Sequence, residues 1–431
     1  MNTKTVSPDY LQGAALDLLK RVLPQERSFA VDLWGQATLP ATRLPAQATL
    51  RIRSPEVLGE MLNPPLDLSL GEAFLRGDLE IAGDLEAAFA AVEEVAPKLS
   101  VSVLQLPALL KNLATLRQQT ASPLAARLRG IAHSKARDRQ AIAHHYDVSN
   151  AFYQLWLDTR MVYSCGYFPS GSETLDQAQQ AKLEHICRKL RLKPGERLLD
   201  IGSGWGGLIL YAAQHYGVEA LGITLSQRQA EETQARIRAA GLEGRVRVEL
   251  LDYREVHETF DKVVSVGMAE HVGRENLPTY FRAAWQALRP GGLMLHHVIT
   301  QGPVALTAGK SLASGEFISR YVFPDGEILP LWQNLEAAEQ VGFEVRDVED
   351  LREHYAFTLR HWVKNLEARW EAAVEEAGAE RARLWRLYMA ASAHQFNYGH
   401  LAVHQALLAR PGEGSWVELP ASRADLYRPA A

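Results

Sequence analysis

The chain has 431 residues, of which 47% are hydrophobic and 23% are charged, and its formal net charge is −5. These fractions are typical of a globular protein and exclude a fibrous or wholly disordered chain. At about 150 residues per domain, the length predicts two or three domains. The net acidity argues against nucleic acid as a partner, because there is no overall basic field.

Hydropathy and cysteine content predict where the protein resides. No apolar run approaches the roughly 20 residues that are needed to cross a bilayer. The first residues, MNTKTVSPDYLQG, lack the basic start and apolar core of a signal peptide. Two cysteines, Cys165 and Cys187, cannot build a disulfide framework. We therefore expect a cytoplasmic protein.

One segment departs from the average charge. Between Leu124 and His145 there are five basic side chains and one acid, a net charge of +4. Such a segment can bind an anionic membrane surface, at about 1 kcal/mol for each Lys or Arg close to it. It can equally be the solvated face of a helix. The side chains are Arg127, Arg129, Lys135, Arg137 and Arg139, with Asp138 as the acid.

The first part of the sequence mixes helical and strand periodicities. An amphipathic helix is predicted before Pro24, which ends it, and two alternating segments predict strands. A further stretch with helical spacing is broken by two glycines, and an Arg-rich, mostly helical connector follows. The predicted segments are Asp9–Val22 (helix), Phe29–Trp34 and Ala48–Arg53 (strands), Leu70–Val95 (helical spacing) and 116–142 (connector).

Beyond Gly195 the pattern changes to strands that alternate with helices. This alternation predicts an α/β fold with a doubly wound, mainly parallel sheet. Val341–Val348 predicts a further strand, and Arg360–Ala409 is predicted to be largely helical. The predicted strands are Arg197–Ile201, Val218–Ile223, Val246–Leu250, Lys262–Val266 and Leu293–Ile299, and the helices between them are Leu208–His215, Gln227–Ala240 and Pro278–Leu288.

A glycine-rich turn follows the first of these strands, in the sequence LLDIGSGWGGL. Its glycines, Gly202, Gly204 and Gly206, let the backbone approach a ligand that side chains would keep away. Asp200 stands just before them, where its carboxylate could accept hydrogen bonds from a ligand amine. Dinucleotide sites carry an acid about 20 residues further on. Here that position reads Gly222-Ile223-Thr224, which disfavours NAD.

Several motifs together resemble the cyclopropane fatty acid synthase family, which comprises S-adenosylmethionine-dependent methyltransferases acting on unsaturated acyl chains of membrane phospholipids. They are LLDIGSGWGGL, GITLSQRQ, LDYR, SVGMAEHVG and HYDVSNAFYQLWLD followed by MVYSCGYF. The resemblance runs from about residue 140 to the last residue. It implies a seven-stranded Rossmann-like catalytic domain over 143–431, after the connector 116–142. Residues 1–115 resemble, more loosely, the family's smaller α+β lipid-binding domain.

The resemblance also implies which residues bind S-adenosylmethionine. Asp200, Gly202 and Gly204 would contact its amino-acid part, and Tyr163 and Ser164 would close over it. Thr224 and Gln229 would take the ribose hydroxyls in place of the missing acid. Asp252 and Tyr253, after the third strand, would approach the adenine. Ligands of such sheets lie at the carboxyl ends of the strands, which agrees with these positions.

A second set of residues is implied to form a bicarbonate site. Each has an ordinary alternative, such as a surface pair for Glu270 or a small buried hydrophobe for Cys165. Strand alternation predicts that His297 points inward and that its neighbour His296 is a core residue. Methyl transfer to an alkene leaves a carbocation, and a positioned base must take a proton before a ring closes. The implied bicarbonate residues are Cys165, Glu270, His297, the backbone of Ile299, and Tyr355.

An apolar path for the acyl group is the third implied feature. Residues Phe317–Pro330 resemble the family's covering segment, with Tyr321 and Phe323 facing the substrate, and Tyr388 is a further candidate. Aromatic residues at helical spacing are more often core residues, so packing is the competing interpretation. A metal site is not expected, because only His400 and His404 have the i, i+4 spacing of a helical metal pair, and no third ligand accompanies them.

These observations predict an enzyme that adds a methylene group to the cis double bond of unsaturated phospholipid acyl chains. S-adenosylmethionine and bicarbonate would be its cofactors, and the carbocation would be deprotonated by bound bicarbonate. The alternatives are a methyltransferase that methylates acyl carbons without closing a ring, and a non-catalytic protein that binds lipid or S-adenosylmethionine. The resemblance also implies a homodimer that associates peripherally with the membrane.

Overall fold

The computed structural model describes residues 23–61, 65–90, 122–146, 148–308 and 315–427, with a few positions between 13 and 20. The molecule divides into two compact units. The first comprises 1–125, 315–321 and 373–394, and the second comprises 126–314, 322–372 and 395–431. The predicted functional boundaries at 115 and 142 stay a prediction, because the units are defined by packing alone.

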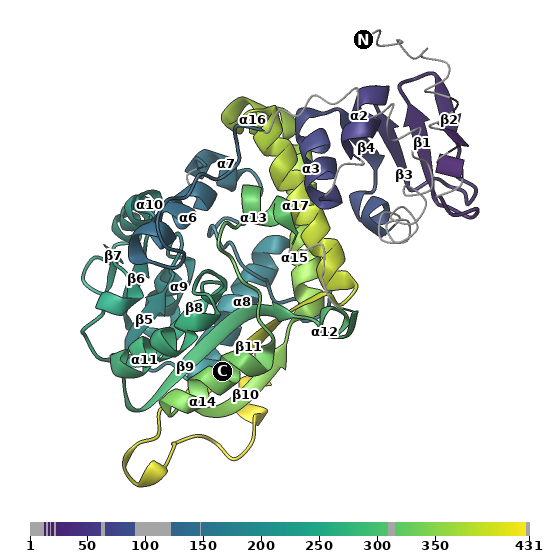
Figure 1. The fold of residues 1–431 in the computed structure, drawn as a ribbon. Helices are drawn as coiled ribbons and strands as arrows, with labels where there is room; N and C mark the ends of the chain where they lie inside the picture. Colours follow the sequence, from purple (N-terminus) through teal and green to yellow (C-terminus); the bar gives the residue numbers. More distant parts are fainter. Residues whose placement is uncertain are drawn as a thin grey trace. The chain divides into compact units, whose positions relative to one another are not determined.

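A seven-stranded sheet forms the centre of the second unit, in the order β10-β11-β9-β8-β5-β6-β7 (Figure 1). The five strands from β9 to β7 are mutually parallel, and β11 runs antiparallel between β9 and β10. This is the α/β doubly wound fold that the alternation predicts, which is confirmed. The strands are β5 (Arg197–Ile201), β6 (Glu219–Thr224), β7 (Val246–Leu250), β8 (Phe260–Val266), β9 (Leu288–Gln301), β10 (Glu344–Asp350) and β11 (Leu401–Ala409).

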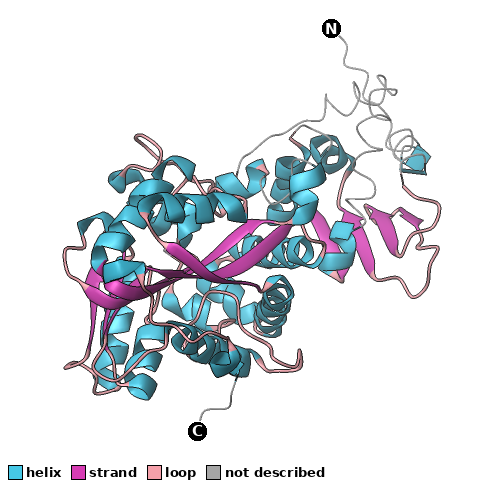
Figure 2. Ribbon diagram, turned by 90° about the horizontal axis from the view of Figure 1, so that it is seen from below, coloured by secondary structure: helices cyan, strands magenta, loops and turns pink. Residues whose placement is uncertain are grey.

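Helices cover both faces of this sheet, as Figure 2 shows from below. Successive strand residues serve opposite faces, so Leu198 packs in one apolar cluster and Leu199 in the other. The first cluster is completed by residues of α8 (Leu175–Leu190), α9 (Gly207–Tyr216) and α10 (Gln227–Ala239). The second is completed by residues of α11 (Leu277–Ala287) and α14 (Leu331–Val341).

The C-terminal part departs from the prediction. The helices α15 (Arg352–Ala368), α16 (Trp370–Ala377) and α17 (Ala379–Asn397) are as expected, but Leu401–Ala409 is strand β11 and not helix. Its Ala- and Leu-rich sequence favours a helix, and burial between two strands overrides that propensity. His400 and His404 therefore do not share a helix face. The predicted strand Val341–Val348 also shifts, since Val341 ends α14 and the strand begins at Glu344.

The first unit has its own four-stranded sheet, in the order β2-β1-β3-β4. The predicted strands correspond to β1 (Phe29–Leu33) and β3 (Ala48–Ile52), which pair in parallel. The predicted break of Leu70–Val95 at Gly77 is confirmed, because Gly77 ends a helix in the left-handed conformation and a strand follows, while residues 91–95 lie outside the described residues. Most of the predicted helix Asp9–Val22 lies outside the described residues. The other elements are β2 (Ala37–Leu39), β4 (Leu79–Gly83), α2 (Pro55–Met61) and α3 (Leu66–Arg76).

The predicted connector is less helical than its sequence suggests. Residues 116–121 lie outside the described residues, and 122–134 form turns, bends and irregular backbone. Helix α6 (Lys135–Tyr146) begins only after them, and α7 (Asn150–Gln154) follows. Within the described part of the molecule, no helix is long and apolar enough to cross a membrane.

Candidate functional site at the carboxyl edge of the sheet

A pocket opens at the carboxyl ends of β5, β6, β7 and β8. All nine residues that the resemblance implies for S-adenosylmethionine line this one pocket, although they come from five separate segments. The fold brings them together because parallel strands end at the same edge of a sheet. They are Tyr163, Ser164, Asp200, Gly202, Gly204, Thr224, Gln229, Asp252 and Tyr253.

The glycine turn forms a cradle with a bare backbone. Gly202 and Gly204 have φ angles of +85° and +55°, which L residues with side chains rarely adopt. A Cβ at Gly202 would meet the Met268 side chain at 2.9 Å, whereas a Cβ at Gly204 would have nothing within 4 Å and would fill open space. The backbone of Gly204 is therefore open to a ligand, which is the arrangement that a close approach requires.

A buried carboxylate and a buried ammonium face this cradle. Asp200 is 3% exposed, and its Oδ1 has no hydrogen-bond partner among the described residues. Burial raises its pKa to about 7, and the charge of Lys182 opposes that shift. Lys182 donates to Ser164 Oγ at 2.9 Å, and burial lowers its pKa to about 8. An unpartnered buried oxygen of this kind fits a ligand amine.

The two residues implied for the ribose are joined to each other. Thr224 Oγ1 donates to Gln229 Oε1 at 2.7 Å, and both side chains are buried. Ser226 caps α10 and accepts a hydrogen bond from the Gln229 N–H, which fixes the first turn of the helix beside the end of β6. Because the Gln229 amide oxygen is occupied, its NH₂ group is the part left to meet a hydroxyl.

Asp252, which the resemblance implies for the adenine, is bound to Arg254. Its carboxylate accepts two hydrogen bonds from that guanidinium, at 2.7 and 2.6 Å, and one from the Arg254 backbone N–H at 2.9 Å. Arg254 also pairs with Asp138 of α6 at 2.9 Å. The bidentate pair holds Asp252 at the pocket wall in a fixed orientation.

Glu270 lies next to this pocket, in the short helix η2 (Ala269–His271) that follows β8. Its Oε1 accepts a hydrogen bond from the Ile299 N–H at 2.7 Å, while its buried Oε2 has no partner among the described residues. Burial raises the pKa of Glu270 to about 7, against the effect of that hydrogen bond. The Ile299 N–H thus positions Glu270 in this structure. Near neutral pH the carboxyl can either donate or accept a proton.

His297 and Cys165 are the other buried members of the implied set. His297 Nδ1 lies 3.2 Å from Gln405 Nε2, and its Nε2 has no partner within the described ranges. Burial lowers its pKa, so the ring is neutral. Burial also raises the pKa of the Cys165 thiol, which stays protonated and lies 3.2 Å from the Gly166 carbonyl. Cys165 therefore offers a weak donor, not a thiolate nucleophile.

Backbone hydrogen bonds connect the segments that carry these residues. The Gly267 N–H of the pocket donates to the His297 carbonyl at 2.9 Å. Ile299 pairs in register with Val403, whose carbonyl accepts from Leu351 N–H at 2.8 Å. The Leu351 carbonyl in turn accepts from Tyr355 N–H at 3.2 Å and lies 3.8 Å from Cys165 Sγ. One edge of the sheet thus connects the pocket with the segments that carry the residues implied for the bicarbonate site.

His296 has the core role that strand alternation predicts for it. It is buried, with the Tyr280 hydroxyl 3.1 Å from Nδ1 and the Asn334 Oδ1 3.3 Å from Nε2. Both ring nitrogens are satisfied, and burial lowers its pKa to about 4. Of the two neighbouring histidines, His296 is therefore structural, whereas the Nε2 atom of His297 has no partner among the described residues.

The three candidates for contact with the acyl group do not fall in one unit. Phe323, in the second unit, stacks on His145 at 4.2 Å and lies 5.6 Å from the His271 ring at the pocket. Tyr321 and Tyr388 belong to the first unit. There the Tyr321 hydroxyl donates to Glu72 at 2.7 Å, and Tyr388 packs against Trp385. Their role toward a substrate stays a prediction.

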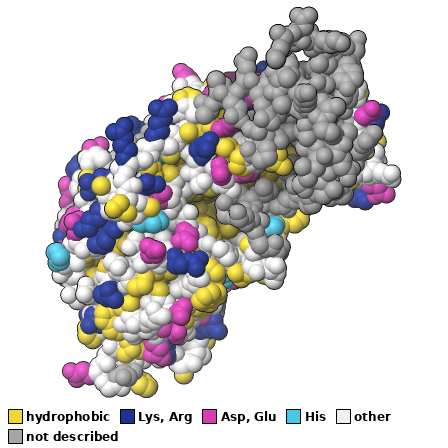
Figure 3. All heavy atoms as spheres, in the orientation of Figure 1, with side chains coloured by type: hydrophobic (Ala, Val, Ile, Leu, Met, Phe, Trp, Pro, Cys, Tyr) yellow, Lys and Arg dark blue, Asp and Glu magenta, His cyan; other side chains and the backbone are white. Residues whose placement is uncertain are grey.

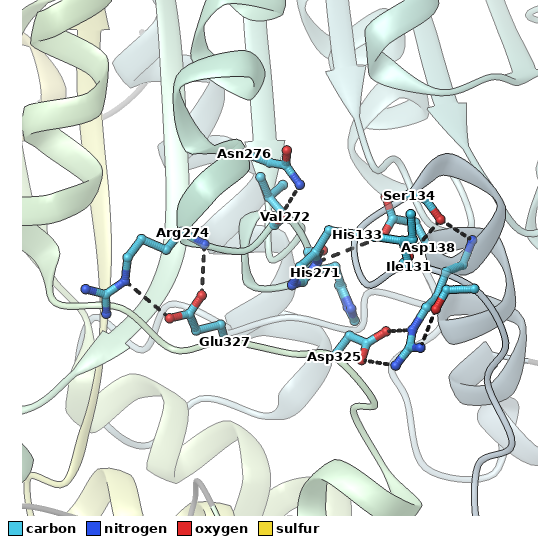
Figure 4. Close-up of polar contacts among 12 residues, drawn as sticks. Ile131, His133, Ser134, Asp138, His271, Val272, Arg274, Asn276, Asp325 and Glu327 are labelled. Atoms are coloured by element: carbon cyan, nitrogen blue, oxygen red, sulfur yellow. Dashed lines mark hydrogen bonds and ion pairs between the residues drawn. The ribbon is translucent and has the colours of Figure 1, made fainter.

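The basic segment is partly neutralised by ion pairs. Arg137 makes a bidentate pair with Asp325, with N···O distances of 2.5 and 2.8 Å, and Lys135 pairs with Glu255 at 2.9 Å. Figure 4 shows His133, Ser134 and Asp138 of this segment beside Asp325 and His271. The Nδ1 atom of His133 lies 3.3 Å from the His271 carbonyl oxygen. These two cations are engaged within the protein, so the membrane-binding alternative depends on the other basic side chains.

Three cations of the segment remain exposed and have no ion pair among the described residues: Arg127, Arg129 and Arg139. Ile131, between them, is 82% exposed. Lys and Arg side chains gather over the region of α6 and α10, with hydrophobic side chains between them (Figure 3).

Sequence reasoning missed Lys182 and Gln405. Lys182 lies on the apolar stripe of α8, together with Leu175 and Ile186. A lysine at such a position is unusual and could have indicated a buried functional cation. Gln405 carried no signal, because its segment was predicted to be helical.

The comparisons with known proteins agree with this geometry. Residues 133–406 match the family model of mycolic acid cyclopropane synthetase. A probable fatty acid methyltransferase of Pseudomonas putida is 42% identical over 89% of the present sequence and 92% of its own length. The cyclopropane-fatty-acyl-phospholipid synthase of Escherichia coli is 34% identical over 85% and 88%.

Solved structures match the second unit's fold. A cyclopropane synthase from Mycobacterium tuberculosis superimposes with a TM-score of 0.60 at 33% identity, spanning 63% of the present sequence and 97% of its own. A mycolic acid cyclopropane synthase in complex with SAH and CTAB gives the same values. In the present structure, the cradle at Gly204 and the unpartnered Asp200 oxygen fit the amino-acid part of S-adenosylmethionine. The chain belongs to the mycolic acid cyclopropane synthetase family, and it is a methyltransferase that uses S-adenosylmethionine.

Proposed function

We propose that the protein transfers a methylene group to the cis double bond of unsaturated phospholipid acyl chains and closes a cyclopropane ring. The observation that carries the proposal is the buried pair of unpartnered atoms beside the cofactor pocket, Glu270 Oε2 and His297 Nε2. A positioned acid–base group in a dry site supports transfer to an alkene, because the resulting carbocation must lose a proton.

The cofactor supplies an electrophilic methyl group when bound. In this proposal Asp200 accepts hydrogen bonds from its amino group, Gly202 and Gly204 lie against its amino-acid part, and Thr224 and Gln229 hold the ribose. Tyr163 and Ser164 close over the amino-acid part, while Asp252 and Tyr253 form the adenine wall. All nine line the same pocket, which supports the assignment.

Bicarbonate would be held by Cys165, Glu270, His297 and Tyr355, whereas the backbone N–H of Ile299, which the resemblance also implies, binds Glu270 in this structure. The donors present fit an anion, because the Cys165 thiol stays protonated and Glu270 has a pKa near 7. A protonated Glu270 donates to the anion, which removes the repulsion that two neighbouring negative charges would cause.

The protein would reach its substrate from the membrane surface. The exposed Arg127, Arg129 and Arg139 would attract anionic headgroups, and Ile131 would insert between them. Tyr321, Phe323 and Tyr388 remain the candidates for contact with the acyl group. A homodimer in the cytoplasm, bound peripherally to the bilayer, completes the proposal.

A direct test incubates the full-length protein with vesicles of unsaturated phospholipid and S-adenosylmethionine. We expect the acyl chains to gain the mass of one CH₂ unit and to show upfield cyclopropyl proton signals. Glu270→Gln should abolish the gain, whereas the control Glu327→Gln should not, since that carboxylate pairs with Arg274 on the surface. No gain with the wild type, or full activity of Glu270→Gln, would overturn the proposal.

The relative at 42% identity favours a second candidate, a fatty acid methyltransferase that forms no ring. A methylene-branched product has the same mass as the cyclopropane, because both add one carbon and lose one proton. The proton spectrum separates them: the branched product shows vinylidene signals and no cyclopropyl signals.

A further inference from the structure

Three neighbouring strands place Glu349, Gln405 and His297 side by side. Glu349 of β10 pairs in register with Gln405 of β11, which pairs in register with His297 of β9. Residues paired across strands point to the same face and contact one another. Gln405 is completely buried and His297 is 1% exposed, so water does not compete for their polar atoms.

Helix α8 adds Lys189 and His185 to this row. Lys189 Nζ lies 2.9 Å from Gln405 Oε1 and 2.5 Å from Glu349 Oε2. His185, one helical turn earlier, lies 2.7 Å from the same Glu349 oxygen. Although burial opposes it, the hydrogen bond from His185 and the charge of Lys189 lower the pKa of Glu349 to about 2. Glu349 is therefore a permanent carboxylate that anchors Lys189.

The direction of each hydrogen bond follows from the chemistry of the groups. A lysine ammonium has donors only, so the Gln405 atom that faces it must be the amide oxygen. The Gln405 NH₂ group, which can only donate, is then the atom 3.2 Å from His297 Nδ1. His297 Nδ1 must accept, and the hydrogen of the neutral ring is consequently on Nε2.

We infer that Gln405, oriented by Lys189, is a positioning residue that fixes His297 in the Nε2–H tautomer. His297 then presents a hydrogen-bond donor to the acid–base site, where its Nε2 has no partner among the described residues. An anion is the ligand that such a donor recognises. This catalytic meaning rests on the proposed function, whereas the tautomer itself does not.

Gln405→Glu tests the inference, because a carboxylate still accepts from Lys189 but can no longer donate to His297. It would accept a hydrogen from Nδ1 instead, which moves the ring to the other tautomer or to the imidazolium. Asn334→Asp is the matched control, since it places a new carboxylate beside His296, where the ring nitrogen already donates.

The measurement is the ring-nitrogen chemical shift of His297 in full-length protein made with isotope-labelled histidine. The His297 signals are assigned by their absence in His297→Asn. We expect the Nε2–H tautomer in the wild type and in Asn334→Asp, and its loss in Gln405→Glu. Gln405→Met, which replaces the amide with an apolar side chain of similar size, should give a mixture of tautomers. It replaces Gln405→Glu in the test if that variant does not fold.

A second readout links the tautomer to catalysis. Where the ring in Gln405→Glu has moved to the Nδ1–H tautomer, the concentration of bicarbonate that gives half-maximal activity should rise at least about tenfold, since a donor to the anion has become an acceptor. An Nδ1–H ring in the wild type, or an unchanged ring in both Gln405 variants, would overturn the inference. If the ring changes its tautomer in Gln405→Glu but the bicarbonate dependence does not change, Gln405 still fixes the tautomer. Only the role of that tautomer in the bicarbonate site is then overturned.

Discussion

Single residues decide the chemistry of this site through burial. Glu270, Asp200 and His297 are ordinary titratable groups whose pKa values are shifted by the loss of water around them. The two carboxyls move to about 7, where either protonation state is accessible, and the imidazole moves to a permanently neutral state. Strongly shifted pKa values of this kind cluster at functional sites.

Glu270→Gln should therefore stabilise the protein at high pH. The folded pKa of Glu270, about 7, lies above its unfolded value, so the native state binds more protons between those values and stability falls as pH rises through that window. The cost is absent at pH values below the unfolded pKa and complete above about 7. The variant should be more stable by about 3 kcal/mol at most in mild alkali, with little difference in acid.

Denaturant unfolding of both proteins without ligands, in acid and in mild alkali, checks this. An equal stability difference under both conditions would contradict the pKa shift of Glu270.

Asp200→Asn should weaken binding of S-adenosylmethionine by roughly 10- to 100-fold, the effect of one charge-assisted hydrogen bond in a buried site. Calorimetric titration measures it. Methylthioadenosine lacks the amino-acid part of the cofactor, so its affinity should be unchanged and it serves as the control ligand. Equal losses for both ligands would show that Asp200 shapes the pocket and does not bind the amine.

At the scale of elements, periodicity predicted the parallel core well. Arg197–Ile201 and Val246–Leu250 have the predicted bounds, because short apolar runs between turn residues leave little choice. Leu401–Ala409 could not be predicted, since its helix-forming residues become a strand only through pairing with β9 and β10. That strand carries Gln405, so the partner of His297 was also beyond sequence reasoning. The pocket residues were identified through their motifs, whereas Lys182 lacked one.

The connector and α6 give a prediction at this scale. Replacing the three exposed arginines together, Arg127→Gln, Arg129→Gln and Arg139→Gln, should weaken binding to anionic vesicles by roughly 1 kcal/mol for each charge at low salt. Cosedimentation with vesicles measures the effect. Arg137→Gln is the matched control: it should leave vesicle binding unchanged and lower the melting temperature, because it leaves Asp325 without its bidentate partner. Equal losses of binding in both proteins would refute the distinction between paired and exposed arginines.

For the whole molecule, neither the net charge of −5 nor the absence of a membrane-spanning helix among the described residues indicates the lipid-directed function that we propose. The family supplies methyl-transfer chemistry, and the second unit contains both the cofactor pocket and the acid–base residues. Ring closure removes a proton from the transferred methyl group, whereas a product that keeps an intact methyl group does not. In our proposal this proton is taken by bicarbonate, which would be bound beside Glu270 and His297.

The most direct test follows that proton with S-adenosylmethionine whose methyl group is fully deuterated. The full-length protein is incubated with unsaturated phospholipid vesicles and bicarbonate, and the acyl chains are analysed by mass spectrometry and proton magnetic resonance. We predict that one deuteron is lost, that a CD₂ unit is incorporated, and that ring-proton signals appear upfield. Acyl groups without label, acyl groups that retain a complete CD₃ group, or labelled acyl groups without ring signals would contradict the proposed function.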